Sequence, residues 1–263
     1  MDATPPDARL SRAREAFLAA GRTLRNERRD FVDWHLGRPR YGLWALQLEE
    51  PAVAGAMAAA QAHLGDCLLP AYRRQPHITV ALGGFPCGEV RWEGDYPLSA
   101  FEAALAALRM SAPQPFVLEI GGLESFASAP FLAVHDVEGG IASLRRALAP
   151  SAPSEEQGRD GDYLPHLTVG LYAGEYDCAA LRARMADFPS APLRLTVRRL
   201  AFLCYDSADI GGPLTPVADY ALADGTVRRQ GDSPFGVAAP ACEQAPPSQT
   251  PLSRLPLGRS QAS

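Results

Sequence analysis

The chain has 263 residues, 47% of them hydrophobic, and a formal net charge of −5. This length allows one large or two small domains with a substantial core, and the hydrophobic content is typical of globular proteins. The negative charge argues against a non-specific binder of long nucleic acid, which needs a broad basic surface. The N-terminus lacks the basic and then apolar segments of a signal peptide, so we expect a cytoplasmic protein.

The residue types that are missing restrict the chemistry further. All 25 basic residues are arginines, and the absence of lysine excludes a lysine Schiff base and a Walker A phosphate loop. The five cysteines include no C-x-x-C pair, which favours scattered reduced thiols over a disulfide framework or a zinc cluster. We therefore expect no metal and no cofactor. Positive charge for a phosphate must come from arginine, protonated histidine or backbone N–H groups.

Hydrophobic spacing, prolines and glycines predict alternating helices and strands. In chain order the predicted elements are a helix (Pro5–Arg29), a strand (Tyr41–Leu48), a helix (Pro51–His63), a strand (His77–Leu82), a helix (Pro97–Arg109), two strands (Phe116–Ile120 and Phe131–His135), a helix after Gly140 that ends near Ala149, a loop (Pro150–Gly161), a strand (His166–Tyr172), a helix (Tyr176–Phe188) and two strands (Leu193–Tyr205 and Val217–Leu222).

The order strand, helix, strand, helix, strand occurs twice, which predicts a duplicated α+β fold. Each half can bury its own sheet under its own helices, so we expect two lobes around a central cleft. We assign residues 1–40 to an N-terminal helical extension and 41–222 to the two-lobed domain. Residues 223–263 are rich in Pro, Gly, Ser and Gln without apolar periodicity, and we predict a disordered tail there.

One five-residue pattern is present twice, as PHITV with His77 and as PHLTV with His166, 89 residues apart. Alternate residues of a β-strand face the same side. Thr79 therefore shares a face with His77, and Thr168 shares a face with His166, while the apolar residues between them face a core. A single H-x-T sequence is weak evidence, but a second copy with the same flanking proline and valine favours a functional reading.

Two histidines and two hydroxyls suit in-line displacement at a phosphodiester. A neutral imidazole can take a proton from the attacking oxygen, and a protonated one can give a proton to the leaving oxygen. A threonine hydroxyl can donate a hydrogen bond to a non-bridging phosphoryl oxygen. Which histidine acts as acid and which as base cannot be read from the sequence.

The two motifs resemble the paired H-x-[ST]-x motifs of the 2H phosphoesterase superfamily, which includes 2′-5′ RNA ligase-like proteins and cyclic phosphodiesterases. The resemblance implies a bilobal α+β duplication with two antiparallel sheets and flanking helices. It also implies activity on 2′,3′-cyclic phosphates or 2′-5′ linkages without an obligatory metal. Carried across, His77 and His166 become the acid/base pair, and Thr79 and Thr168 the phosphate-binding hydroxyls.

Other residues near the motifs are weaker candidates for substrate binding. Tyr172 lies six residues after His166 and would share its face in an uninterrupted strand, and Arg74 precedes the first motif. Superfamily members that act on RNA often have an arginine a few residues after a motif histidine. Positions 80–83 and 169–172 have no basic residue, which favours a small nucleotide or another cyclic phosphate.

We therefore predict a metal-independent phosphodiesterase that acts on 2′,3′-cyclic phosphate or 2′-5′ bonds of nucleotides or RNA ends. We expect a monomer that has a small nucleotide or RNA end as its substrate and no association with membranes. Two alternatives remain open, a non-catalytic protein that binds a nucleotide or phosphate, and a ligase that forms 2′-5′ bonds at RNA ends.

Overall fold

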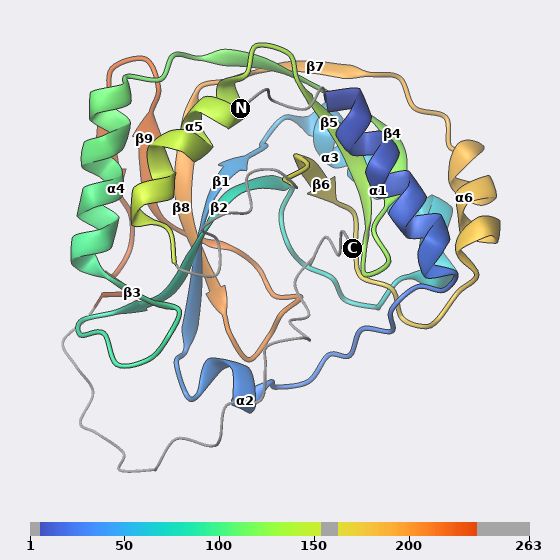
Figure 1. Cartoon of the computed structure of the whole chain (residues 1–263), viewed down its shortest axis with the longest axis horizontal. Coiled ribbons are helices and arrows are strands. Elements are labelled where there is room, and N and C mark those ends of the chain that lie inside the picture. Colours follow the sequence, from blue (N-terminus) through green and yellow to red (C-terminus); the bar gives the residue numbers. More distant parts are fainter. Residues whose placement is uncertain (1–5, 154–162, 236–263) are drawn as a thin grey trace.

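The structure is a computed structural model that describes residues 6–153 and 163–235. The strands within these ranges form two sheets (Figure 1). The larger sheet has the order β10-β9-β8-β1-β2-β3 and the smaller sheet the order β6-β5-β4-β7. All neighbouring strands are antiparallel except β2 and β3. The strands are β1 (Arg40–Gln47), β2 (His77–Cys87), β3 (Asp95–Pro97), β4 (Phe116–Ser125), β5 (Pro130–Asp136), β6 (His166–Thr168), β7 (Leu193–Val197), β8 (Arg199–Asp206), β9 (Thr215–Ala221) and β10 (Val227–Arg229).

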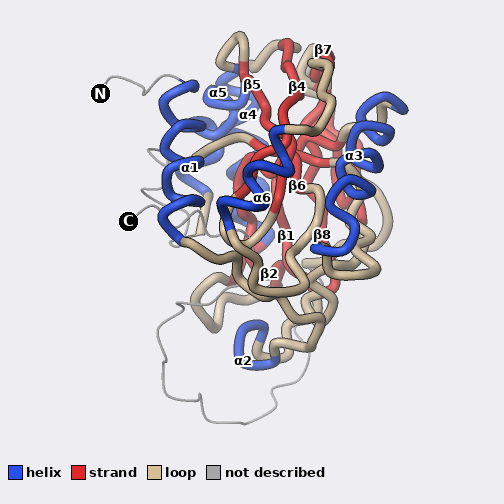
Figure 2. The backbone as a smooth tube through the Cα atoms, turned by 90° about the vertical axis from the view of Figure 1, so that its right-hand side faces the viewer, coloured by secondary structure: helices blue, strands red, loops and turns tan. Residues whose placement is uncertain are grey.

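Helices flank both sheets. They are α1 (Pro6–Ala20), α2 (Val32–His35), α3 (Pro51–Leu64), α4 (Leu98–Ser111), α5 (Gly140–Leu148) and α6 (Cys178–Ala186), with 3₁₀ turns at Gly65–Cys67 and Ala149–Ser151. Figure 2 shows the strands between α1, α4 and α5 on one side and α3 on the other. Buried side chains from both sheets and from the five longer helices form one continuous apolar core. The predicted α+β class, with two mainly antiparallel sheets and flanking helices, is confirmed.

The two sheets are not the two halves of the chain. The strand predicted at Leu193–Tyr205 is in fact two strands, β7 in the smaller sheet and β8 in the larger sheet, separated by Arg198. The last three strands of the chain thereby join the sheet that begins with β1. The prediction of one self-contained sheet in each half is therefore wrong, because continuous apolar sequence does not reveal where a strand leaves one sheet for another.

The first motif strand is longer and less regular than predicted. It continues through Gly83 and Gly84 to Cys87, and its register with β1 shifts at Val80, which has no partner there. Such a bulge turns consecutive side chains to one side, and Val80 and Ala81 are both buried in the main core. Gly83 fits because a Cβ atom there would lie 2.6 Å from the ring of Phe202.

The N-terminal helix is shorter than predicted, and the N-terminal segment packs into the folded core. Helix α1 ends at Ala20, because Gly21 has the left-handed backbone conformation (φ 69°) that stops a helix. The chain then runs beside residues 172–177, with N–H groups of Thr23 and Asn26 donating to carbonyl groups there at 2.9 Å. The helix predicted to reach Arg29 therefore overruns by nine residues, and α1 lies beside α6 and the smaller sheet (Figure 1).

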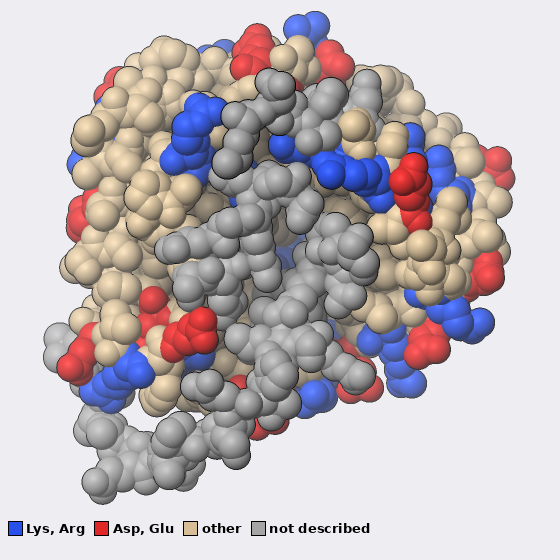
Figure 3. Space-filling view, viewed as in Figure 1, with Lys and Arg blue, Asp and Glu red and all other residues tan. Residues whose placement is uncertain are grey.

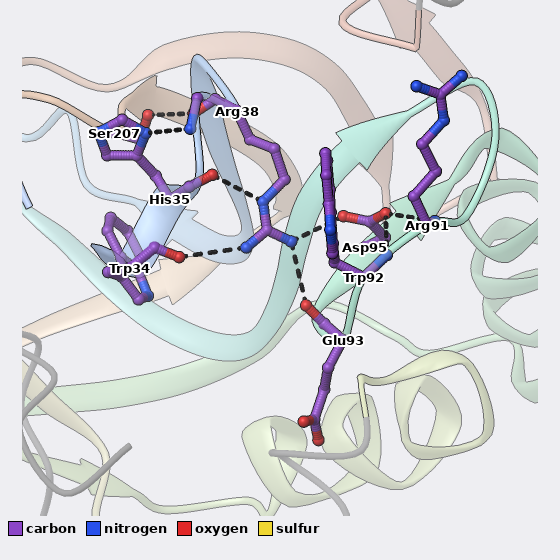
Figure 4. A network of polar contacts seen from close by, with 9 residues as sticks. Trp34, His35, Arg38, Arg91, Trp92, Glu93, Asp95 and Ser207 are labelled. Atoms are coloured by element: carbon purple, nitrogen blue, oxygen red, sulfur yellow. Dashed lines mark hydrogen bonds and ion pairs between the residues drawn. The ribbon is translucent and has the colours of Figure 1, made fainter. Parts of the chain in front are cut away.

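Arg38 attaches the residues around α2 to the larger sheet (Figure 4). Its guanidinium donates to the carboxylate of Asp95 at 2.7 Å and to the carbonyl oxygens of Trp34, His35 and Glu93. The Arg38 Cζ atom also lies 3.6 Å from the centroid of the Phe85 ring. Because Arg38 is largely buried, this network fixes the segment before β1 onto the end of β2 and β3.

The C-terminal boundary also differs from the prediction. The prediction of a disordered tail from residue 223 is wrong for residues 223–235, since β10 pairs with β9 and Phe235 is buried. The Phe235 ring packs against Phe101, with 5.2 Å between the ring centroids. Local composition misses this order because the stability comes from distant aromatic partners. Residues 236–263 lie outside the described residues.

We predict that α1 contributes to the stability of the whole fold. Phe17 is 2% exposed in the main core, whereas its neighbour Leu18 is 47% exposed. Phe17→Ala should lower the free energy of unfolding by about 3–5 kcal/mol, because it removes a buried ring and leaves a cavity. Leu18→Ala, the matched control, should cost less than about 1 kcal/mol. Denaturant unfolding measures both, and equal effects of the two substitutions would refute this role of α1.

Candidate functional site

Each motif histidine is the first residue of its strand, His77 in β2 and His166 in β6. The residues that alternate with the motif side chains are buried in the main core, as predicted; they are Ile78, Val80, Leu167 and Val169. The side chains of His77 and Thr79 therefore share the opposite face of β2, and those of His166 and Thr168 share the opposite face of β6.

The two imidazoles are anchored in the same way. The Nδ1 atom of His77 lies 2.8 Å from the carbonyl oxygen of Gln75, and that of His166 lies 2.8 Å from the carbonyl oxygen of Leu164. A carbonyl oxygen only accepts, so Nδ1 carries the hydrogen and Nε2 remains available to exchange a proton. A proline precedes each histidine and restricts Gln75 and Leu164 to extended backbone, which aims their carbonyl groups.

The fold brings the two histidines into one site. Strands β2 and β6 belong to different sheets but contact each other, and Figure 1 shows them near the middle of the molecule. The charge of His166 is one cause of the lowered pKa of His77, so the two rings interact electrostatically. The Tyr163 hydroxyl, on the approach to β6, donates to the Thr79 carbonyl oxygen on β2 at 2.8 Å.

The environment disfavours protonation of both imidazoles. Burial, the Arg74 guanidinium and His166 lower the pKa of His77 from 6.5 to about 4, against the opposing effect of its bond to Gln75. Burial also lowers the pKa of His166, opposed by its bond to Leu164. At neutral pH both rings are therefore neutral in the free protein, and a bound anion would favour uptake of a proton.

Arg74 is a buried, fixed positive charge beside the first histidine. The residue is 8% exposed, and its Nε and Nη2 atoms have no hydrogen-bond partner in the described part of the chain. Its Cζ atom lies 4.1 Å from the centroid of the Tyr205 ring. A buried guanidinium with unused N–H groups is costly, and an anion would satisfy it. The neighbouring Arg73 is exposed and pairs with Asp209 at 2.7 Å.

The threonine hydroxyls are also available to a ligand. Thr79 and Thr168 are both partly exposed, and among the described residues neither side-chain hydroxyl makes a hydrogen bond. Each can donate one hydrogen bond to an acceptor placed beside the neighbouring imidazole. The two Nε2 atoms, the two hydroxyls and the guanidinium thus form a set suited to a phosphate.

Sequence reasoning missed the residues that surround His166. Its ring centroid lies 5.0 Å from that of Phe126 and 5.5 Å from that of Phe131. Arg145, from α5, donates to the carbonyl oxygen of Val80, and its Cζ atom lies 3.8 Å from the centroid of the Tyr163 ring. Tyr163 lies three residues before His166, as Arg74 lies three before His77, and this equivalence was the only signal available from the sequence.

The sequence of the chain matches the profile of one known protein family. The sequence profile described as the 2′-5′ RNA ligase superfamily matches residues 49–209, which is more than half of the chain and includes both motifs. The chain belongs to the 2′-5′ RNA ligase superfamily. The resemblance to 2H phosphoesterases that the two motifs indicated is thereby confirmed. The comparison with curated proteins finds no matching sequence.

Several solved structures resemble the chain at low sequence identity. TT0787 of Thermus thermophilus is 17% identical with a TM-score of 0.47, covering 69% of this chain and 97% of that one. LigT of E. coli in complex with ATP is 15% identical with a TM-score of 0.45, covering 70% and 99%. LigT in complex with 3′-AMP is 18% identical with a TM-score of 0.42, covering 70% and 99%.

One predicted site residue of this superfamily member lies elsewhere. The strand predicted to extend from His166 to Tyr172 ends at Thr168, so the alternation that placed Tyr172 beside His166 does not apply. Tyr172 is 0% exposed in the main core, and its hydroxyl oxygen lies 2.6 Å from Ser125 Oγ. The prediction that Tyr172 contacts substrate is therefore not carried forward.

Residues 6–153 and 163–235 contain neither a cluster of metal ligands nor a membrane-spanning helix. Within these residues, no three His, Cys, Asp or Glu side chains are grouped so that they could hold a metal ion. In the same part of the chain, no helix combines the length and the apolar character that crossing a membrane requires.

We predict that His77 makes folding stability depend on pH. Its pKa is about 4 in the folded protein and 6.5 ordinarily, so the unfolded chain binds the proton more readily. The free energy of unfolding is therefore undiminished by His77 above pH 6.5. It falls by up to about 3 kcal/mol as the pH falls toward 4, because protons then bind His77 in the unfolded chain first. Denaturant unfolding at several pH values should show a smaller loss for His77→Gln than for the wild type.

His63→Gln is the control for this experiment, since His63 lies on α3, outside both sheets, and its Nε2 atom bonds to the Arg184 carbonyl oxygen. It should keep the pH dependence of the wild type. The prediction is wrong if the wild type and His77→Gln lose the same free energy of unfolding between pH 6.5 and pH 4.

Proposed function

We propose that the protein is a metal-independent phosphodiesterase that opens 2′,3′-cyclic phosphates or 2′-5′ bonds of nucleotides or RNA ends. The observation that carries this proposal is the matched anchoring of two neighbouring imidazoles, each with Nδ1 on a carbonyl oxygen and Nε2 available. This arrangement supports a reaction in which the two imidazoles exchange protons on opposite sides of a phosphorus atom. The superfamily membership supports the same class of reaction.

The proposed reaction is an in-line displacement. One imidazole takes a proton from water as its oxygen attacks phosphorus, and the other gives a proton to the departing ribose oxygen. The Thr79 and Thr168 hydroxyls and the Arg74 guanidinium bind the non-bridging oxygens, where they stabilise the charge of the transition state. Arg74 thus serves as the substrate-binding arginine that positions 80–83 and 169–172 do not supply.

The charge distribution favours a small substrate or a nucleic-acid end. In Figure 3 basic and acidic side chains are interspersed among the described residues of this face, without a continuous basic surface. The net charge of −5 has the same implication. A long RNA would need a broad basic surface for its many phosphates, whereas a single phosphodiester needs only a local site.

Ligation of RNA ends is a second candidate, because the matching superfamily is described by that activity. The same two imidazoles can catalyse this reaction, in which a ribose hydroxyl instead of water attacks the cyclic phosphate. The two reactions differ in the nucleophile, water in one case and a hydroxyl group in the other. A product assay with a 2′,3′-cyclic phosphate end and a free 5′-hydroxyl end therefore separates them.

We predict that both motif histidines are essential for turnover. His77→Ala and His166→Ala should each lower kcat/KM on 2′,3′-cyclic nucleotides or 2′-5′ dinucleotides by at least about 10²–10⁴-fold. Activity should survive EDTA. Thr79→Val and Thr168→Val should cost less, about 10–100-fold, because each removes one hydrogen bond to the transition state.

His63→Ala is the matched control, since His63 lies on α3 and its Nε2 atom bonds to the Arg184 carbonyl at 2.8 Å. Its activity should stay close to that of the wild type. The proposed function is wrong if either motif histidine variant retains most activity while its denaturant unfolding matches that of the wild type. Binding of cyclic nucleotides by the wild type without any product would indicate the non-catalytic alternative.

A further inference from the structure

The two copies of the motif match at the histidine anchors but differ three residues before each histidine. That position is Arg74 in the first copy and Tyr163 in the second. A guanidinium is always charged, whereas a phenol is neutral at working pH. The first of these two equivalent positions is therefore itself permanently charged, and the second is not.

The register of the larger sheet places Arg74 on the same face as Thr79. Thr79 is opposite Ala45 on β1, and Ala45 is opposite Ala201 on β8, so these three side chains share a face. Tyr205 follows Ala201 by four residues along β8 and lies in the same apolar cluster. Since the guanidinium of Arg74 stacks on the Tyr205 ring, it lies on the face that carries His77 and Thr79.

The segment that carries Arg74 is fixed on both sides. The amide side chain of Gln75 donates to the Leu214 carbonyl oxygen at 3.1 Å and accepts from the Leu214 N–H at 2.8 Å. The Arg73 N–H donates to the Gly211 carbonyl oxygen at 2.8 Å. Gln75 also accepts the Nδ1 hydrogen of His77. The guanidinium and the imidazole are thus held in a fixed relation by one short stretch of backbone.

The surroundings of His166 are different. The neighbours of its ring are the uncharged rings of Phe126 and Phe131, with 5.0 Å and 5.5 Å between the centroids. The charged groups on this side have other partners: Arg145 binds the Val80 carbonyl, Arg9 the Tyr163 carbonyl, and Arg14 pairs with Glu124. None of these charges is among the causes that lower the pKa of His166, whereas Arg74 is the second cause at His77.

We infer that Arg74 divides the work of the two imidazoles, so that His77 is the general base and His166 the general acid in hydrolysis. This inference rests on the proposed function. When an anionic phosphodiester binds between the two rings, its charge favours uptake of one proton. The proton goes to His166, because the fixed charge of Arg74 opposes an imidazolium at His77. Arg74 is in this respect a positioning residue for the proton.

The proposed step conserves atoms and charge. The water oxygen forms a bond to phosphorus as its proton passes to Nε2 of His77. The bond from phosphorus to the ribose oxygen breaks as that oxygen receives the proton from Nε2 of His166. Afterwards His77 is charged and His166 neutral, and exchange with solvent restores the starting state. The attacking water therefore lies on the side of β2 and the leaving ribose oxygen on the side of β6.

An NMR titration of the histidine side chains tests the role of Arg74 without any turnover. With adenosine 2′-monophosphate, a product of ring opening, as the bound probe, His166 should take up a proton at higher pH than His77. Arg74→Met should raise the pKa of His77 by about one or more, because it removes a nearby like charge. Arg74→Lys should restore the wild-type value. Arg73→Met, at the exposed neighbouring position, should change neither histidine.

The assignment is overturned if His77 takes up its proton before His166. It is also overturned if Arg74→Met and Arg73→Met leave the pKa of His77 equally unchanged. The signals are assigned by comparison with the His77→Gln and His166→Gln variants, and the titration is repeated without the probe so that weak binding does not decide the result.

A change of leaving group tests the roles of the histidines themselves. Bis(4-nitrophenyl) phosphate has no ribose hydroxyl, so water must attack, and 4-nitrophenolate departs without a proton. His166→Ala should lose about 10²–10⁴-fold on the cyclic phosphate but less than about tenfold on the aryl diester. His77→Ala should lose activity on both substrates. The reverse pattern would overturn the assignment.

The controls separate this inference from the proposed function. A wild-type protein inactive on every phosphodiester would refute the proposed function and the acid/base roles together, whatever the NMR titration shows. Activity that requires both histidines, together with equal losses on the aryl diester for the two variants, would leave the proposed function standing and overturn only the division of roles. If the wild type opens the cyclic phosphate but not the aryl diester, the order of protonation by NMR decides.

Discussion

The bulge at Val80 and the two hydrogen bonds beside it connect the motif strands. Because Val80 has no partner on β1, its carbonyl oxygen is free to accept from Arg145, and the adjacent Thr79 carbonyl oxygen accepts from the Tyr163 hydroxyl. Both donors come from chain outside the larger sheet. Buried carbonyl groups must find partners, and here the partners hold the approach to β6 against β2. These two hydrogen bonds therefore help to set how the two motif histidines lie relative to each other.

The site combines a near-symmetric framework with asymmetric electrostatics. The framework is the repeated bond from Nδ1 to the carbonyl oxygen two residues earlier, which fixes each ring and leaves Nε2 available. The asymmetry comes from Arg74 on one side and the aromatic rings around His166 on the other. Two groups with the same chemistry can take different roles when their surroundings favour different charge states. In a duplicated fold, a change in the neighbours of each histidine is enough to make the two imidazoles favour different charge states.

Segments outside the superfamily match complete the fold. The match ends at residue 209, yet β9 and β10 extend the larger sheet and Phe235 packs against Phe101. On the N-terminal side, α1 places Phe17 in the main core, and Arg38 fastens the chain to β3. These segments bury surface that the two sheets would otherwise expose, so the folded unit is larger than the matched region.

The sequence by itself determined the two motif strands, the face of each that carries a histidine and a threonine, and the chemistry those residues allow. All of these follow from local alternation and residue type. Only the tertiary structure decided that β2 and β6 meet, that Arg74 stacks on Tyr205, and that Tyr172 lies in the core. Alternation along one strand specifies its faces but not its partners, because pairing between distant segments depends on the packing of the whole chain.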